Sequence, residues 1–126
     1  MKEVKTSKRI LAIDDEPEFL AAIKPVLVGA GYDVVTESDP QSGLSKAIAE
    51  HFDLIILDVA MPSMDGYQIC ERLKVERATF NVPVLFVSAK REPADLLKGF
   101  FSGAHEYLTK PVRQADLVSK VERLLR

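Results

Sequence analysis

Short apolar runs and amphipathic segments alternate five times along the chain, and this alternation constrains the fold more than any other feature. The apolar runs have the length of strands and lie at residues 10–13, 34–35, 54–57, 82–87 and 107–108. Each is followed by a segment of helical length in which apolar residues recur at spacings of three and four. Strands that are apolar on both faces and separated by helices indicate a parallel sheet covered on both sides. The sequence therefore predicts a doubly wound α/β fold with five strands and five helices.

Turn and cap residues support the predicted helix boundaries. The residues that begin or end a predicted helix are Gly29 and Gly31, Asp39-Pro40, Asp65-Gly66, and Pro93. Pro25 is the one conflict, because a proline inside a helix removes a backbone hydrogen bond. We expect a kink in the first helix at that position.

The size and charge of the chain indicate a single domain that does not bind nucleic acid or cross a membrane. Its 126 residues fit one domain, which we place at residues 8–126 after a polar leader at residues 1–7. The net charge of -2 provides no attraction for nucleic acid, and the apolar runs are too short to cross a membrane. Cys70 is the only cysteine and no signal peptide is evident, so we expect no internal disulfide and a cytoplasmic location.

Polar side chains stand where four of the five predicted strands end. Asp14-Asp15 follow the first strand, Asp58 the third, Ser88 the fourth and Lys110 the fifth. In an open parallel sheet, ligands bind in the crevice beyond the carboxyl ends of the strands. We therefore expect these carboxylates, the hydroxyl and the ammonium to converge at one edge of the sheet.

This set of side chains suits a metal-assisted phosphoryl transfer. Carboxylates that lie close together repel one another unless a cation shares the space, and Mg²⁺ prefers such oxygen ligands. A carboxylate can also attack phosphorus when the charge on the phosphoryl oxygens is neutralised. Asp58, with Mg²⁺ on one side and Lys110 on the other, meets that requirement.

Four motifs in order make the chain resemble the receiver domains of two-component response regulators. The motifs are Ile13-Asp14-Asp15-Glu16, the stretch at residues 58–66, Ser88-Ala89, and the stretch at residues 107–111. The match runs from about Lys8 to the C-terminus. The resemblance implies a flavodoxin-like sheet with strand order 2-1-3-4-5. It also implies a signalling switch rather than an enzyme, one that assists its own phosphorylation and dephosphorylation.

The resemblance assigns a role to each residue of the site. Asp58 is the expected phosphoacceptor, and Lys110 is expected to pair with it and then with the phosphoryl group. The expected Mg²⁺ ligands are Asp14, Asp15, Asp58 and the backbone carbonyl of Ala60.

The resemblance also implies which residues contact the phosphoryl group and which side chains move when it is bound. The backbone of Ala60 and Ala89 would contact it, and Ser88 would move to donate a hydrogen bond to it. Tyr107 would turn inward to fill the space that the serine leaves. The peptide bond before Pro111 is expected to be cis, which aims the preceding lysine inward. An alanine at residue 60 cannot position water through its side chain, so the lifetime of the phosphorylated state is left open.

The partners follow from the same resemblance. They are a histidine kinase or a histidine phosphotransfer protein, a downstream effector, and a second copy bound through helix 4, strand 5 and helix 5. Within the predicted fourth helix, the apolar spacing places Leu97 and Phe100 in the core and leaves Leu96 and Phe101 at its margins. At least one of the two marginal side chains should then be partly exposed and able to contact a partner.

The same residues allow other interpretations. Asp14 or Asp15 alone could cap the first helix. A phosphatase of the haloacid dehalogenase type needs a second acid two positions after its nucleophile, where this chain has Ala60. An adaptor that binds partners without phosphorylation is a further alternative. We expect Asp65-Gly66 to be structural, Cys70 to be buried, and both histidines, His51 and His105, to lie at the surface or in loops.

Overall fold

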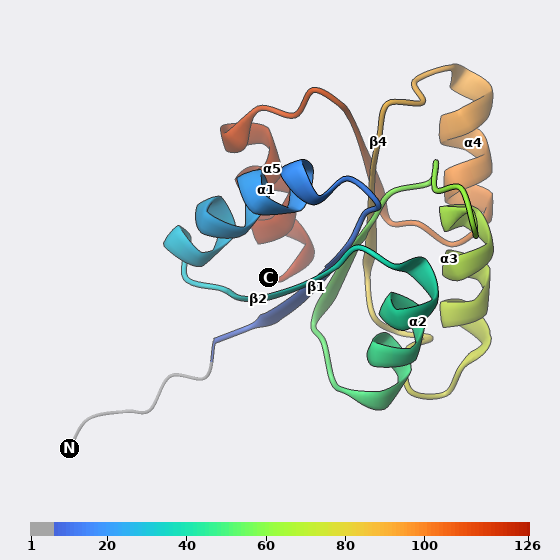
Figure 1. Cartoon of the computed structure of the whole chain (residues 1–126), viewed down its shortest axis with the longest axis horizontal. Coiled ribbons are helices and arrows are strands. Elements are labelled where there is room, and N and C mark those ends of the chain that lie inside the picture. The colour runs from blue at the N-terminus through green and yellow to red at the C-terminus, as the bar shows by residue number, and fades with distance from the viewer. Residues whose placement is uncertain (1–6) are drawn as a thin grey trace.

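A computed structural model describes residues 7–126 and shows a parallel sheet between two layers of helices (Figure 1). The strands are β1 (Arg9–Ile13), β2 (Asp33–Glu37), β3 (Leu54–Leu57), β4 (Val84–Ser88) and β5 (Glu106–Thr109). The helices are α1 (Pro17–Gly29), α2 (Pro40–Ala49), α3 (Gly66–Val75), α4 (Pro93–Phe101) and α5 (Gln114–Leu124). All neighbouring strands are parallel, in the order β2-β1-β3-β4-β5, which confirms the predicted fold and strand order. Of the predicted leader, residues 1–6 lie outside the described part of the chain.

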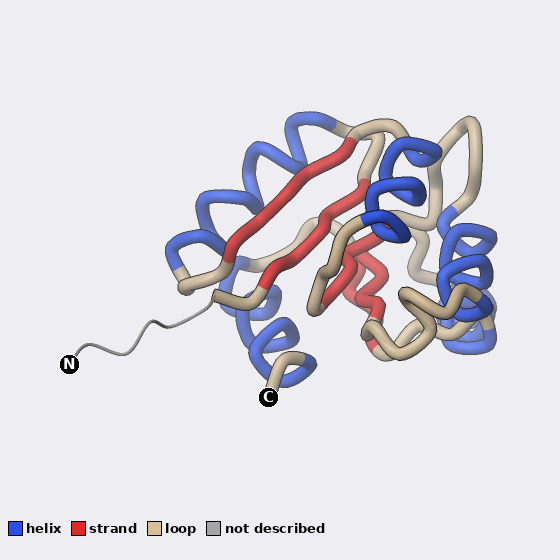
Figure 2. The backbone as a smooth tube through the Cα atoms, turned by 90° about the horizontal axis from the view of Figure 1, so that it is seen from below, coloured by secondary structure: helices blue, strands red, loops and turns tan. Residues whose placement is uncertain are grey.

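Alternate residues of the central strands supply two separate apolar layers. In β1, Leu11 and Ile13 pack on the side of α2, α3 and α4, whereas Ile10 and Ala12 pack on the side of α1 and α5. Figures 1 and 2 show these two helical layers on opposite faces of the sheet. Because the central strands are buried on both faces, their sequences are almost continuously apolar.

The helices begin and end close to the predicted positions. Asp39 caps α2 by accepting a hydrogen bond from the backbone N–H of Ser42 at 2.8 Å, and Asp65 caps α3 in the same way from Gln68 at 2.8 Å. Gly31 follows α1 with a φ of 102°, a conformation that glycine adopts without strain. Pro25 lies inside α1, and the kink expected there stays a prediction.

The face that α4 buries differs from the predicted one. Leu97 and Phe100, which we expected in the core, are 58% and 46% exposed, whereas Leu96 packs against the core and Gly99 is buried. The reason is Gly99, whose lack of a side chain lets the helix backbone approach the ring of Phe86. Because apolar residues lie on more than one side of α4, their spacing did not determine which side is buried. The close approach of the helix backbone at Gly99 to Phe86 determines it. Phe101 is 83% exposed, which confirms that at least one of the two marginal residues is exposed.

The cysteine and the two histidines lie where the sequence predicts. Cys70 is fully buried, as expected, and both histidines, His51 and His105, are exposed. His105 still makes a specific contact, because its Nδ1 accepts a hydrogen bond from the backbone N–H of Val84 at 3.3 Å. Within residues 7–126, no helix combines the length and the apolar character needed to cross a membrane.

Candidate functional site

The site lies at the carboxyl edge of the sheet, where the chain leaves β1, β3 and β5. Backbone hydrogen bonds continue one residue beyond the strands: the N–H of Asp58 donates to Ile13 at 3.1 Å, and that of Lys110 donates to Ser88 at 2.8 Å. The N–H of Asp14 donates to Glu37 at 3.1 Å. These bonds fix the backbone on which the functional side chains stand.

Lys110 is the cation at the centre of the site, and its side chain is only 13% exposed. Its Nζ lies 2.8 Å from Oδ2 of Asp14, 2.6 Å from Oε1 of Glu16 and 3.5 Å from Oδ2 of Asp58. The peptide bond between Lys110 and Pro111 is cis, as expected. The ammonium therefore contacts the expected phosphoacceptor, but it lies closer to two other carboxylates.

Asp14 and Asp58 are both buried, at 2% and 4% exposure. Each also accepts a backbone hydrogen bond, Asp14 from Glu16 at 2.9 Å and Asp58 from Ala60 at 3.1 Å. Burial raises the pKa of Asp14 to about 6, against the opposing effect of the hydrogen bond from Lys110. Burial acts to lower the pKa of Lys110, but the hydrogen bonds to Asp14 and Glu16 and the negative charges of Asp58 and Asp14 together outweigh it and raise that pKa.

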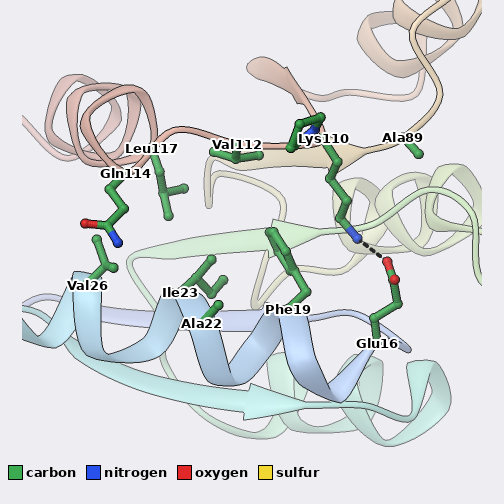
Figure 3. A pocket seen from close by; sticks show the side chains of 11 residues that line it. Glu16, Phe19, Ala22, Ile23, Val26, Ala89, Lys110, Val112, Gln114 and Leu117 are labelled. Carbon is green, nitrogen blue, oxygen red and sulfur yellow. Dashed lines mark hydrogen bonds and ion pairs between the residues drawn. The ribbon is translucent and has the colours of Figure 1, made fainter.

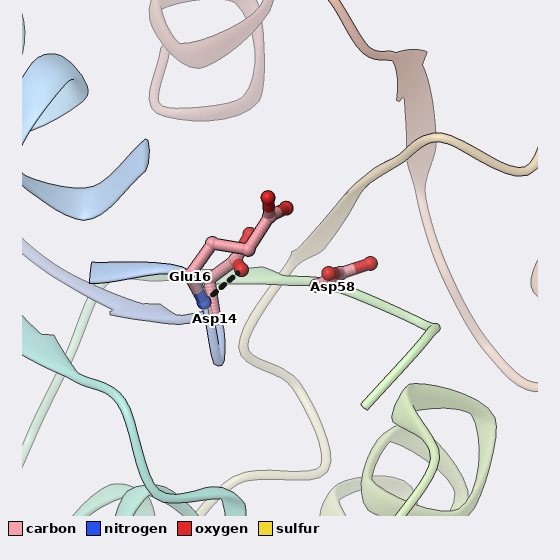
Figure 4. Close-up of side chains that lie close together, drawn as sticks. All are labelled: Asp14, Glu16 and Asp58. Carbon is pink, nitrogen blue, oxygen red and sulfur yellow. Dashed lines mark hydrogen bonds between the residues drawn. The ribbon is translucent and has the colours of Figure 1, made fainter. Parts of the chain in front are cut away.

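Three carboxylates form a cluster that could hold a metal ion. Oxygen atoms of Asp14, Glu16 and Asp58 lie within 4.8 Å of one another. Figure 4 shows the three side chains close together. The ammonium of Lys110 contacts all three, so this space already accommodates a cation. Carboxylate oxygens at such spacing fit the preference of Mg²⁺ for hard oxygen ligands.

The membership of this cluster differs from the expected ligand set. Asp15, an expected ligand, is only partly buried and is not among the three clustered residues. Glu16 is among them, although sequence reasoning assigned it no role. Its signal was its position, because it directly follows the paired aspartates at the carboxyl end of β1.

The expected switch residues lie on β4 and β5. Ser88 is completely buried, and its Oγ accepts a hydrogen bond from the backbone N–H of Lys90 at 3.3 Å. The hydroxyl of Tyr107 donates to the carbonyl of Lys90 at 2.8 Å, and its ring packs edge-to-face on Phe86. The tyrosine ring is thus buried, and the backbone of Lys90 forms hydrogen bonds with both Ser88 and Tyr107.

The two expected backbone contacts of a phosphoryl group, Ala60 and Ala89, are both exposed at this edge of the sheet. An open cavity of about 550 Å³ lies between α1 and α5, and Ala89 is among the residues that line it. Figure 3 shows its mainly apolar walls, formed by side chains such as Ile23 and Leu117, and the polar end formed by Lys110 and Glu16.

The sequence agrees with a known family over nearly its whole described length. The model of the response regulator receiver domain matches residues 10–122. The chain belongs to this receiver domain family. Domains of the family act as signalling switches in two-component systems. Three of the four sequence motifs supply the carboxylate cluster of this receiver domain and the lysine that contacts it.

Curated relatives and solved structures agree with this assignment. The receiver domain is 38% identical over 120 residues to the alkaline phosphatase synthesis transcriptional regulatory protein PhoP of Bacillus subtilis, covering 95% of this chain and 49% of PhoP. It is 40% identical over 118 residues to the DNA-binding dual master transcriptional regulator RpaA of Synechocystis, covering 94% of this chain and 49% of RpaA. The chain thus spans about half the length of the curated relatives that it matches.

Solved structures extend the likeness to the fold. The chemotaxis protein CheY4 of Vibrio cholerae superimposes with a TM-score of 0.90 at 30% identity, covering 95% of this chain and all of CheY4. The receiver domain of sensor histidine kinase PA1611 from Pseudomonas aeruginosa, solved with a magnesium ion in its active-site cleft, gives a TM-score of 0.87 at 25% identity. That match covers 95% of this chain and 98% of the PA1611 domain.

Proposed function

We propose that this receiver domain accepts a phosphoryl group on Asp58 from a phosphohistidine of a histidine kinase or histidine phosphotransfer protein. The observation that carries the proposal is the position of Asp58, which is 4% exposed and lies 3.5 Å from the ammonium of Lys110. A carboxylate in this position is held for reaction at the carboxyl edge of the sheet, where ligands of doubly wound folds bind.

The proposed reaction needs little machinery beyond positioning and charge. An oxygen of Asp58 attacks phosphorus, a P–O bond forms, and the P–N bond to the donor imidazole breaks. The electron pair of that bond stays on the nitrogen, and a donor ring already protonated on its other nitrogen leaves as neutral imidazole. Lys110 neutralises negative charge on the phosphoryl oxygens, and Ser88 donates a hydrogen bond to one of them. The domain modifies its own side chain, and it assists the later hydrolysis through the same groups.

We further propose that Mg²⁺ binds at this site, held by Asp14, Asp15, Asp58 and the backbone carbonyl of Ala60. When bound, the ion would offset the charge of the carboxylates and of the incoming phosphoryl group. The oxygen chemistry of the carboxylate cluster supports this, as does the magnesium ion in the PA1611 receiver domain. Glu16 adds a further carboxylate at the edge of the same site.

The proposed output is a change in the surface made by α4, β5 and α5. Three apolar side chains on α4 are largely exposed there, Leu97, Phe100 and Phe101. On β5, Glu106 binds Lys120 at 3.0 Å and Arg123 at 2.9 Å. Apolar area flanked by both signs of charge suits a symmetric contact, and we propose a second copy of the domain as the occupant.

Sedimentation of the phosphorylated domain tests this surface. Phe101→Glu and Leu97→Glu should each weaken self-association without loss of folding, whereas Val75→Glu, exposed at 78% on α3, should not. Self-association that is unchanged by the first two variants would contradict the homodimer. A monomer under all conditions would instead favour a downstream effector as the partner.

Intact mass after incubation with acetyl phosphate tests the central proposal. With Mg²⁺, the wild type and the control variant Asp116→Asn, altered at an exposed residue of α5, should gain one phosphoryl group, and Asp58→Asn should gain none. Chelation of Mg²⁺ should abolish the gain. If neither acetyl phosphate nor a phosphohistidine donor modifies the wild type, an adaptor that works without phosphorylation becomes the better interpretation. The cytoplasmic location stays a prediction, which cell fractionation would test.

A further inference from the structure

The shortest ion pair of the site joins Lys110 to Glu16. Their atoms Nζ and Oε1 lie 2.6 Å apart, which is 0.9 Å less than the 3.5 Å from the same Nζ to Oδ2 of Asp58. Figure 3 shows the lysine side chain extending toward the carboxylate of Glu16 at the start of α1. The shortest contact of the ammonium is thus with a residue that is not the phosphoacceptor.

Among the described residues, the side chain of Glu16 makes a hydrogen bond and an ion pair with Lys110 alone. Glu16 occupies the cap position of α1, yet its side chain accepts no hydrogen bond from the helix backbone. The caps of α2 and α3, Asp39 and Asp65, both use their carboxylates in that way. The carboxylate of Glu16 therefore does not accept a capping hydrogen bond from α1 and instead pairs with the lysine.

Phe19 contacts the same ammonium from the first turn of α1. The Nζ of Lys110 lies 4.2 Å from the centre of the phenyl ring, a distance at which a cation is attracted to the face of the ring. Residues three apart on a helix lie on one side, so Glu16 and Phe19 face the lysine together. The start of α1 thus offers the ammonium both a negative charge and an aromatic surface.

We propose that Glu16 is a positioning residue that draws the ammonium of Lys110 toward the start of α1, so that phosphoryl acceptance requires the lysine to leave Glu16. The inference rests on the proposed function of Asp58. Before acceptance, Glu16 and Phe19 stabilise Lys110 from α1, in addition to the contact with Asp14. Afterwards, the phosphoryl oxygens are the stronger partner, and the contact with Glu16 is given up. Glu16 therefore stabilises the unphosphorylated site and slows its modification.

The rate of phosphorylation by acetyl phosphate, measured at saturating Mg²⁺, tests this role. Glu16→Gln should be phosphorylated about two- to fivefold faster than the wild type, the factor expected for loss of one partly exposed ion pair. Hydrolysis of the aspartyl phosphate should be unchanged, because the contact is already broken in that state. Phe19→Leu should give a smaller increase in the same direction. The matched control is Glu18→Gln, because Glu18 is exposed and forms no ion pair among the described residues.

A second background separates positioning from a general effect of charge. Weaker repulsion of the anionic donor would also raise the rate after loss of an acid, and that effect would persist in a Lys110→Gln background because it does not need the lysine. If Glu16 acts by holding the lysine, Glu16→Gln should leave the rate of Lys110→Gln unchanged. A rate increase that persists there, or an unchanged rate in the single variant, would overturn the inference. If no variant and not even the wild type gains a phosphoryl group, the proposed function of Asp58 fails first, and the inference fails with it.

Discussion

The α-carbon of Gly66, at the start of α3, packs directly against the backbone carbonyl of Asp58. A Cβ at residue 66 would overlap that oxygen and lie 2.6 Å from the Cα of Val59. The backbone N–H of Gly66 also donates to the carbonyl of Val59 at 3.0 Å. The loop that follows Asp58 is therefore held against the beginning of α3, and only glycine leaves room for this contact.

Gly66→Ala should destabilise the domain and displace the loop that carries the proposed phosphoacceptor. Because backbone atoms and not a flexible side chain receive the new methyl group, we expect a loss of about 2–4 kcal/mol in the free energy of unfolding. Urea denaturation measures this loss, and phosphorylation by acetyl phosphate should also slow. Gly29→Ala is the control, since no atom lies within 4 Å of a Cβ there, and it should change stability by less than about 1 kcal/mol. Equal effects of the two substitutions would contradict this account.

The raised pKa of Asp14 predicts a pH-dependent gain from Asp14→Asn. A pKa raised from 3.8 to about 6 means that the folded state binds the proton more tightly than the unfolded state. The stability that Asp14 contributes is thus present below about pH 3.8 and is lost as the pH rises through about 6. The increase in the pKa of Asp14 corresponds to up to about 3 kcal/mol of stability that the wild type loses when Asp14 ionises. Asp14→Asn avoids this loss but weakens the hydrogen bond from Lys110, so we expect the variant to be more stable by about 1–2 kcal/mol at neutral pH.

Urea denaturation without divalent cations measures this gain. The difference between Asp14→Asn and the wild type should grow from pH 4 to pH 7, the range in which Asp14 ionises. A difference that is constant over this range would show that ionisation of Asp14 is not its cause. Added Mg²⁺ should stabilise the wild type, since a ligand that binds only the folded state favours it, and should stabilise the variant less.

Gly99→Ala should move α4 away from the sheet. A Cβ at residue 99 would lie 2.9 Å from the ring of Phe86 and 3.2 Å from that of Tyr107. We expect a loss of about 1–3 kcal/mol in stability, together with changed chemical shifts of the Tyr107 ring. Leu97→Ala on the exposed side of the same helix should alter neither strongly. Unchanged Tyr107 resonances in the glycine variant would contradict the close packing.

Cys70 should resist alkylation in the folded protein. It is fully buried, and burial raises the pKa of its thiol to about 11, so the reactive thiolate is both rare and inaccessible near neutral pH. Iodoacetamide should leave the intact mass of the native domain unchanged and should add one carbamidomethyl group in guanidinium chloride. Modification at similar rates in both solvents would mean that this part of α3 opens readily.

Much of the site could be predicted because the apolar pattern of the sequence shows where each strand ends. The alternation of apolar runs and amphipathic segments gave five strands and five helices, and the parallel sheet then placed Asp14, Asp58 and Lys110 at one edge. The sheet order came from the family resemblance, because apolar strands do not reveal which neighbour each one takes. These features depend on residue type and spacing, which the sequence contains.

Only the tertiary structure decided which neighbouring carboxylates gather in one cluster. Of the three consecutive acids, Asp14 and Glu16 lie in the cluster with Asp58, and Asp15 is not among its three members. The buried face of α4 was decided by the approach of Gly99 to Phe86, not by apolar spacing. Sequence by itself determined the elements and the edge at which the reactive groups meet. Packing determined the directions of individual side chains, since these depend on contacts between segments that are far apart along the chain.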